Sequence, residues 1–81
     1  MVVEISVTLK EGVLDPQAKA IDHALKSLGF LDIKNVSLGK KIILEFDHHN
    51  KQQALLEAQK MSEELLANTV IEDYFIHVRE K

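Results

Sequence analysis

The chain has 81 residues, enough for one small domain, and a domain of this size buries only about 60–65% of the surface that its unfolded form exposes. It contains no cysteine, which excludes disulfides and thiolate zinc sites and leaves self-association as the expected source of further stability. The net charge of −3, with 10 Lys and Arg against 13 Asp and Glu, argues against nucleic acid as a partner. We therefore expect a single domain over residues 1–81 that forms at least a homodimer.

The first predicted element is a strand over residues 2–9. Its apolar side chains alternate with polar ones, so that Val3, Ile5, Val7 and Leu9 share one face. This start lacks the basic residues and the continuous apolar run of a signal peptide, and no apolar stretch approaches the roughly 18 residues of a membrane span. The sequence therefore predicts a cytoplasmic protein.

A helix is predicted to begin at Pro16. Asp15 provides an N-cap, and proline is tolerated at the first helical position because the amide proton there has no partner in any case. Apolar residues then recur at spacings of three and four in one stripe: Leu14, Ala18, Ile21, Leu25 and Leu28. Gly29 supplies a left-handed residue that ends the helix.

The second half of the chain reads as a hairpin, a helix and a last strand. Strands are predicted around residues 33–38 and over 41–46, with a tight connection at Gly39 and Lys40. Asn50 caps the next helix, with Gln53 three residues later, and Asn68 is expected to close it in a left-handed conformation. The apolar stripe of this helix is Ala54, Ala58, Met61 and Leu65. The last strand is expected over residues 70–78.

This order of elements, β-α-β-β-α-β, predicts an α+β fold of the ferredoxin-like type. In that fold a four-stranded antiparallel sheet has both helices on one face, and the strand over 70–78 lies at an edge. This strand carries apolar residues on both sides, although free edge strands are usually blunted by charge or proline. Ile71 and Phe75, together with Ile43 on the open sheet face, are therefore candidate residues of a homo-oligomer interface.

No residue pattern indicates catalysis by this chain. His48 and His49 are adjacent and have no third ligand nearby in sequence, which favours a solvated turn pair over a metal site. Glu72 and Asp73 point to opposite sides of a strand and cannot share one proton. Asp15 would repel a phosphate at the helix start near Gly12, and no serine lies in a nucleophile motif. We expect no catalytic residue, no bound cofactor and no metal site.

The stretch from Asn68 to Tyr74 admits two interpretations. One is structural: the helix stops, the strand starts, and Tyr74 packs its ring with the hydroxyl at the rim. The other is a contact segment, because Glu72 and Asp73 around the aromatic Tyr74 resemble the polar rim and anchor of a protein interface. Asn68, Glu72, Asp73 and Tyr74 are therefore candidate partner-interface residues.

Two segments carry a family resemblance that covers nearly the whole chain. They are residues 10–17, KEGVLDPQ, and residues 65–74, LLANTVIEDY. Together with the order and spacing of the elements, they resemble PurS, the small subunit of phosphoribosylformylglycinamidine (FGAM) synthase. The chain departs from the family pattern at Ala18, where glycine is common, and at Thr69, where proline usually follows the asparagine; both changes suit the local structure.

The resemblance implies a noncatalytic role. A PurS subunit would bridge a PurL-type synthetase and a PurQ-type glutaminase, so that ammonia from glutamine is used to convert formylglycinamide ribonucleotide into formylglycinamidine ribonucleotide in purine biosynthesis. It implies that the complex uses ATP, Mg and glutamine, and that this chain holds none of them. Because the members of this family act as scaffolds, the resemblance implies no catalytic residue in this chain.

Two other modules share the same element order. An ACT-like regulatory domain would bind a small molecule near Gly12, although such modules are normally fused to an enzyme. An RNA-binding domain would need aromatic residues in the stacking motif of its central strands, and Phe30, Phe46, Tyr74 and Phe75 do not form one. The ACT-like module is the stronger alternative.

Overall fold

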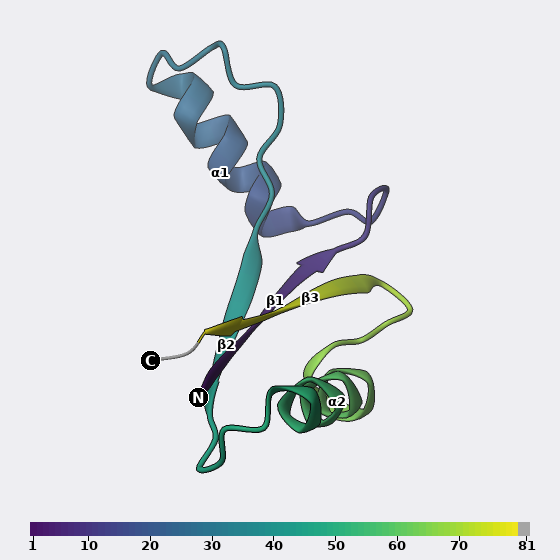
Figure 1. Cartoon of the computed structure of the whole chain (residues 1–81). Helices are drawn as coiled ribbons and strands as arrows, with labels where there is room; N and C mark the ends of the chain where they lie inside the picture. The colour runs from purple at the N-terminus through teal and green to yellow at the C-terminus, as the bar shows by residue number, and fades with distance from the viewer. Residues whose placement is uncertain (80–81) are drawn as a thin grey trace.

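A three-stranded antiparallel sheet forms the centre of the computed structural model, which describes residues 1–79 (Figure 1). Strand β1 (Val2–Leu9) lies between β2 (Gly39–Glu45) and β3 (Glu72–Arg79). The predicted bounds of the first strand are confirmed, and the other two strands differ from their predicted ranges by one or two residues at each end. The α+β class and the antiparallel sheet are therefore confirmed.

One face of the sheet packs against a helix that presents only small side chains. Helix α2 (Lys51–Met61) lies on β1 and β3, where Ala54 and Ala58 are fully buried against Val3, Ile5 and Val7. The N-cap is the predicted one, since Asn50 Oδ1 accepts the Gln53 amide proton at 3.1 Å. Because the helix side chains are short, the branched strand residues supply most of the core volume.

A π-helical turn, η1 (Ser62–Leu66), continues α2 and changes which of its residues face the sheet. The buried Ser62 donates its hydroxyl proton to Ala58 O at 2.8 Å, and Ala67 N–H bonds to Ser62 O at 2.9 Å. A π-turn places one more residue in the turn than an α-helix does. Ala67 is therefore buried, whereas Met61 and Leu65 are 38% and 82% exposed, so the predicted stripe is wrong at these two positions.

Helix α1 (Pro16–Ser27) has the predicted start and end but not the predicted place. Asp15 Oδ1 accepts the amide protons of Gln17 and Ala18, and Gly29 has a φ of 101°. The helix projects away from the sheet instead of covering it (Figure 1). Of its predicted apolar stripe only Ala18 is buried, while Leu14 and Leu28 are 69% and 73% exposed. The expectation that both helices cover one sheet face is wrong for the single chain.

The predicted hairpin between residues 33 and 46 is also absent from the described chain. Residues 33–38 form no strand, and Gly39 and Lys40 are the first two residues of β2. The chain runs straight from this connection into the sheet (Figure 1). Glycine at position 39 allows β2 to approach β1 closely. A Cβ at this position would lie 2.8 Å from Thr8 Cγ2 and 2.9 Å from Val7 O.

The molecule consequently has two unequal parts. We call residues 13–38, with α1 and the extended connection, the arm, and the remaining described residues the sheet half. The overall dimensions are 48 × 29 × 14 Å and the radius of gyration is 16.1 Å, whereas a compact domain of this length has a radius of gyration of about 12 Å. The arm accounts for this extended shape.

Candidate partner-contact surface

The two sequence segments that carry the family resemblance lie side by side in the structure. The Lys10 amide donates to Ile71 O at 2.7 Å, and Lys10 Nζ pairs with Asp73 Oδ1 at 3.0 Å. The chain turns directly after Lys10, where Gly12 has a φ of 88° and Val13 N–H bonds to Lys10 O at 3.2 Å. We call residues 10–17 and 68–74 together the motif corner.

Asn68 and Glu72 build the turn that leads into β3. Asn68 Oδ1 accepts the Val70 amide proton at 3.2 Å, an Asx-turn, and Asn68 O accepts the amide proton of Glu72 at 2.7 Å. In return, Glu72 Oε1 accepts the Asn68 amide proton at 2.7 Å. No described residue other than glycine has a positive φ, so the left-handed conformation predicted for Asn68 is wrong. The side chain of Asn68 reverses the chain instead.

Tyr74 links β3 to the π-helical turn. Its hydroxyl donates to Glu63 Oε2 at 2.7 Å. This hydrogen bond to a carboxylate raises the pKa of Tyr74 above its ordinary value of 10.0, because ionisation would remove the donor and place two negative charges together. The hydroxyl is therefore fixed at the molecular surface as a hydrogen-bond donor.

All four candidate partner-interface residues thus make contacts within the chain. Glu72 is half-buried, whereas Asn68 and Asp73 are exposed. Their partners Lys10 and Glu63 were not identified from the sequence. Lys10 follows the strand that pairs with β3, so strand register is a signal that could have identified it, whereas no local pattern connects Glu63 to Tyr74.

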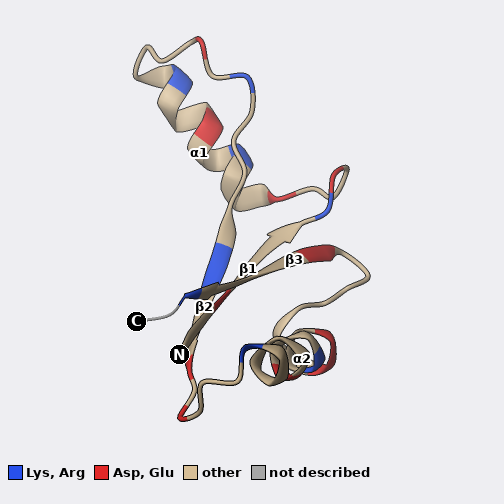
Figure 2. Ribbon diagram, viewed as in Figure 1, with Lys and Arg blue, Asp and Glu red and all other residues tan. Residues whose placement is uncertain are grey.

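A cleft of about 730 Å³ opens between the start of α1, residues 34–38 and the motif corner. Both signs of charge line it: Lys10, Lys19 and Lys34 with Glu11, Asp15, Asp22 and Asp73. Over the rest of the described chain, acidic and basic residues are likewise interspersed (Figure 2). Asp22 pairs with Lys26 at 3.2 Å through one carboxylate oxygen, and the other is buried without a hydrogen-bond partner. This mixed lining does not favour a phosphate over other polar groups.

The candidate oligomer-interface residues are exposed in the single chain. Ile43 and Phe75 are 56% and 68% exposed on the sheet face opposite α2, and Ile71, just before β3, is 38% exposed. On the same face Glu4 pairs with Lys41 at 3.3 Å and with Arg79 at 2.7 Å, one pair to each neighbouring strand. The one carboxylate at the centre of this face is thereby neutralised.

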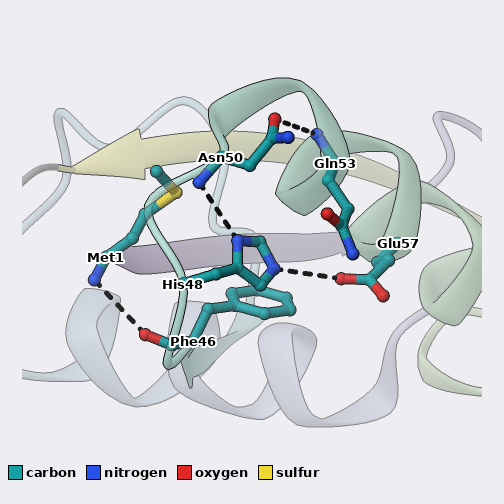
Figure 3. A network of polar contacts seen from close by, with 6 residues as sticks. All are labelled: Met1, Phe46, His48, Asn50, Gln53 and Glu57. Atoms are coloured by element: carbon teal, nitrogen blue, oxygen red, sulfur yellow. Dashed lines mark hydrogen bonds and ion pairs between the residues drawn. The ribbon is translucent and has the colours of Figure 1, made fainter.

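His48 takes part in a network at the other end of the sheet (Figure 3). Its Nδ1 accepts the Asn50 amide proton at 3.1 Å, which places the proton of the neutral ring on Nε2, 3.4 Å from Glu57 Oε1. The ring also lies against Phe46, with centroids 5.2 Å apart. His48 is thus a structural residue of the approach to α2, whereas His49 is exposed as predicted.

Within residues 1–79, no group of three or more His, Asp or Glu side chains is arranged to hold a metal ion. No helix of this part of the chain is both long and apolar enough to cross a membrane.

Comparison with known proteins extends the resemblance to the full described chain. The sequence profile of the PurS family, described as phosphoribosylformylglycinamidine (FGAM) synthase, matches residues 2–80. The PurS subunit of FGAM synthase from Bacillus subtilis (strain 168) is 44% identical over 78 residues, which cover 96% of this chain and 92% of that protein. Its counterpart from Archaeoglobus fulgidus is 40% identical over 80 residues, covering 99% and 100%.

Solved structures agree with this fold. Methanocaldococcus jannaschii PurS superposes with a TM-score of 0.87 at 36% identity, covering 99% of this chain and 96% of that one. A chain in the structure of PurLQS from Thermotoga maritima superposes with a TM-score of 0.81 at 33% identity, covering 95% and 96%. With the profile, the sequences and the fold in agreement over nearly its whole length, the chain belongs to the PurS family of FGAM synthase subunits.

Proposed function

We propose that this chain is a noncatalytic subunit of FGAM synthase that bridges a PurL-type synthetase and a PurQ-type glutaminase in purine biosynthesis. One observation carries the proposal: the fold matches, over 95% of its length, a chain in the PurLQS structure from Thermotoga maritima. In the complex, formylglycinamide ribonucleotide is converted into formylglycinamidine ribonucleotide with ammonia from glutamine. ATP, Mg and glutamine are handled by the other subunits, and this chain contributes contacts.

The polar residues of the motif corner already make contacts within the chain, and this supports a role in contacts with partner subunits. Asp73 is held by Lys10, and Tyr74 by Glu63, so these side chains have fixed positions before any partner arrives. Fixed side chains lose less conformational entropy on binding than free ones. The structural and the contact interpretation of Asn68, Glu72, Asp73 and Tyr74 are therefore compatible.

Reconstitution tests the bridging role. The chain is mixed with the synthetase and glutaminase subunits from the same source, and product formation is measured with glutamine and, separately, with ammonia. We expect glutamine-dependent turnover to need the chain and ammonia-driven turnover to proceed without it. The proposal fails if glutamine-dependent turnover is the same with and without the chain.

A charge reversal tests the contact residues separately. Glu72 closes the turn through Asn68, so its replacement would disturb the fold, and Asp73→Lys is the better probe because this carboxylate is exposed. Asp47→Lys is the matched control, an equal charge change at an exposed residue beyond the far end of β2. We expect Asp73→Lys to weaken assembly with the partner subunits, measured by analytical ultracentrifugation. Equal assembly of both variants would remove Asp73 from the contact surface.

Self-association is part of the proposal, because the single chain leaves large apolar side chains uncovered. Leu14, Leu28 and Leu31 of the arm and Phe75 of the sheet half are each more than two-thirds exposed. Leu14 and Leu28 belong to the apolar stripe of α1, and an exposed apolar patch marks an interaction site in soluble proteins. We expect a homo-oligomer by light scattering at micromolar concentration, and a monomer under these conditions would refute this part.

A further inference from the structure

The side chain of His48 joins the end of the sheet to the start of helix α2 (Figure 3). It lies in the loop between β2 and α2, and its ring packs on Phe46 with the centroids 5.2 Å apart. Phe46 is itself held to the start of the chain, since its amide donates to Met1 O at 2.9 Å. The two ring nitrogens of His48 contact two places on the helix, the N-cap Asn50 and Glu57. One imidazole therefore connects the sheet, the N-cap and the body of α2.

The bond between Asn50 and His48 replaces one half of a capping box. In a capping box the N-cap side chain accepts the amide proton of the third helical residue, and the side chain of that residue accepts the N-cap amide proton. Here Asn50 Oδ1 accepts the amide proton of Gln53 at 3.1 Å, as in that motif. The amide proton of Asn50, however, goes to His48 Nδ1 at 3.1 Å. The start of α2 therefore depends on a side chain that can change its charge.

The two contacts of the His48 ring are unequal. The bond from the Asn50 amide has an ordinary length, whereas Nε2 lies 3.4 Å from Glu57 Oε1, beyond the usual range of roughly 2.7–3.2 Å for N–H donors. The side chains of His48 and Glu57 are 34% and 43% exposed, so solvent protons reach both. The neutral ring is thus bonded mainly to the N-cap, with Glu57 as a second partner within reach.

A second proton on the ring changes these two contacts in opposite directions. It must bind Nδ1, because Nε2 already carries the proton of the neutral ring. Two N–H groups would then face each other across the 3.1 Å between His48 Nδ1 and Asn50 N, so this bond is lost. The imidazolium would be attracted by the Glu57 carboxylate, because charge-assisted bonds of this kind are shorter and stronger than neutral ones. The positive end of the helix dipole also disfavours a cation at the N-cap.

The other charged groups around the ring leave Glu57 as its acidic partner on the helix. Glu57 is the only acidic residue of α2, and the first turn of this helix carries a basic residue, Lys51. Asp47 and His49 flank His48 in the loop, and both are exposed. The N-terminal ammonium of Met1 is bonded at 3.4 Å to a main-chain oxygen just after β2.

We propose that His48 is a pH switch at the start of α2: the neutral ring holds the N-cap amide of Asn50, and the protonated ring releases this amide and turns to Glu57. Histidine side chains change charge between about pH 5 and 8, so the first turn of α2 opens more often in acid. The switch acts on the helix that covers the sheet and continues into η1, where Glu63 holds Tyr74. It stands apart from the bridging role and from self-association, and its test is separate from theirs.

Nuclear magnetic resonance of the nitrogen-15-labelled full chain between about pH 8 and 5 tests the switch. At the upper end of this range we expect the ring proton of His48 on Nε2. As the pH falls, we expect the amide resonance of Asn50 to shift with the same midpoint as the His48 ring. Amide exchange in the first turn of α2, corrected for the intrinsic effect of pH, should rise roughly five-fold, the factor that one net hydrogen bond contributes. A neutral ring with its proton on Nδ1, or an Asn50 resonance that does not follow the ring, would overturn the switch.

His48→Asn separates protonation from hydrogen bonding. The asparagine oxygen can accept the Asn50 amide proton in place of Nδ1, but an amide side chain takes up no proton in this pH range. We expect exchange in the first turn of α2 to become independent of pH in this variant. His49→Asn is the matched control, the same replacement at the neighbouring exposed histidine, and should keep the pH dependence of the native chain. PH dependence that persists in His48→Asn, or is lost in both variants, would refute the switch. If His48→Asn does not fold, the measurements on the native chain decide the question.

Glu57→Gln tests the second half of the switch, the turn of the ring toward the helix. In the native chain we expect nuclear Overhauser contacts between the His48 ring and the Glu57 side chain to strengthen as the pH falls. The glutamine side chain can accept a hydrogen bond but carries no charge to attract an imidazolium. We therefore expect no such strengthening in Glu57→Gln. Contacts that stay constant with pH in the native chain, or strengthen equally in both proteins, would refute the turn toward Glu57.

Discussion

The sheet half and the arm differ in how they hold their structure. In the sheet half, Val3, Ile5 and Val7 are at most 1% exposed, and both alanines of α2 are fully buried. In the arm only Ala18 is buried, although its helix carries the more regular apolar stripe. Regular apolar spacing therefore predicts an apolar helix face, but it does not predict that the same chain covers that face.

The local sequence signals for the start of a helix are equally clear in the arm and in the sheet half. Both helices begin at a capping side chain, Asp15 in the arm and Asn50 in the sheet half. The parts differ in long-range contacts, because β1 pairs along nearly its whole length with both neighbouring strands. Tertiary contacts thus stabilise the sheet half, whereas mainly local contacts stabilise the isolated arm.

The largest expected effect concerns the centre of the sheet half. Ile5 is fully buried between Ile42 and Ile76 of the neighbouring strands. Ile5→Ala removes buried methyl and methylene groups and leaves a cavity, which we expect to lower the free energy of unfolding by about 2–5 kcal/mol. Urea unfolding followed by circular dichroism measures this loss.

Leu28→Ala is the matched change in the arm, at a side chain that is 73% exposed. At a concentration low enough to dissociate any oligomer, we expect it to change the free energy of unfolding by less than about 0.5 kcal/mol. Above that concentration, a loss that appears with association would come from the interface. Equal losses for Ile5→Ala and Leu28→Ala in the dissociated chain would contradict the division into two parts.

The elements that the sequence predicts well are those fixed by local chemistry. Alternation sets β1, and Asp15 with Pro16 and Asn50 with Gln53 set the two helix starts. The placement of α1 could not be predicted for a single chain, because its stripe has the same pattern whichever sheet it covers. The hairpin prediction is wrong for a related reason. Glycine at position 39 is typical of a tight turn, but it is equally typical of a close contact between strands, which Gly39 makes with Val7.

The contacts of the candidate partner-interface residues could not be predicted from the sequence. The expected edge strand and the family motif single out Asn68, Glu72, Asp73 and Tyr74, yet the bonds of Asp73 to Lys10 and of Tyr74 to Glu63 depend on strand register and on the π-helical turn. Neither the strand register nor the π-helical turn has a local signal in the sequence. The same turn places Leu65 at the surface and Ala67 in the core, since one extra residue in a turn rotates every later side chain.

The two helix caps provide a smaller and more local test of the same division. Asp15→Ala and Asn50→Ala each remove a side-chain acceptor for helix amide protons, which typically costs about 1 kcal/mol. Because α1 lies away from its own sheet, we expect the loss at Asp15 to increase amide exchange throughout α1 and leave the sheet unaffected. At Asn50 we expect faster exchange in α2 and β1 together, measured by hydrogen exchange with mass spectrometry.

The comparison between the caps is made at a concentration low enough to dissociate any oligomer, because self-association would add contacts to the arm. In the dissociated chain the Asp15→Ala effect should stay within the arm. Faster exchange of β1 in the dissociated Asp15→Ala variant, to the same degree as in Asn50→Ala, would show that the arm and the sheet half unfold as one unit.

The smallest expected effect is a pKa difference at the junction of the motif corner and η1. Tyr74 is the single tyrosine and the chain has no tryptophan, so its ionisation can be followed by absorbance without interference. The hydrogen bond to Glu63 raises the folded-state pKa of Tyr74 above 10.0, so this bond stabilises the fold at lower pH and its contribution is lost as the pH rises through the raised pKa. Glu63→Gln removes the negative charge, and we expect the pKa of Tyr74 to return toward about 10. Glu64→Gln, an equal change at the next residue along η1, should leave the titration of Tyr74 as it is, and an equal downward shift in both variants would mean that general charge, not the Glu63 bond, sets the pKa.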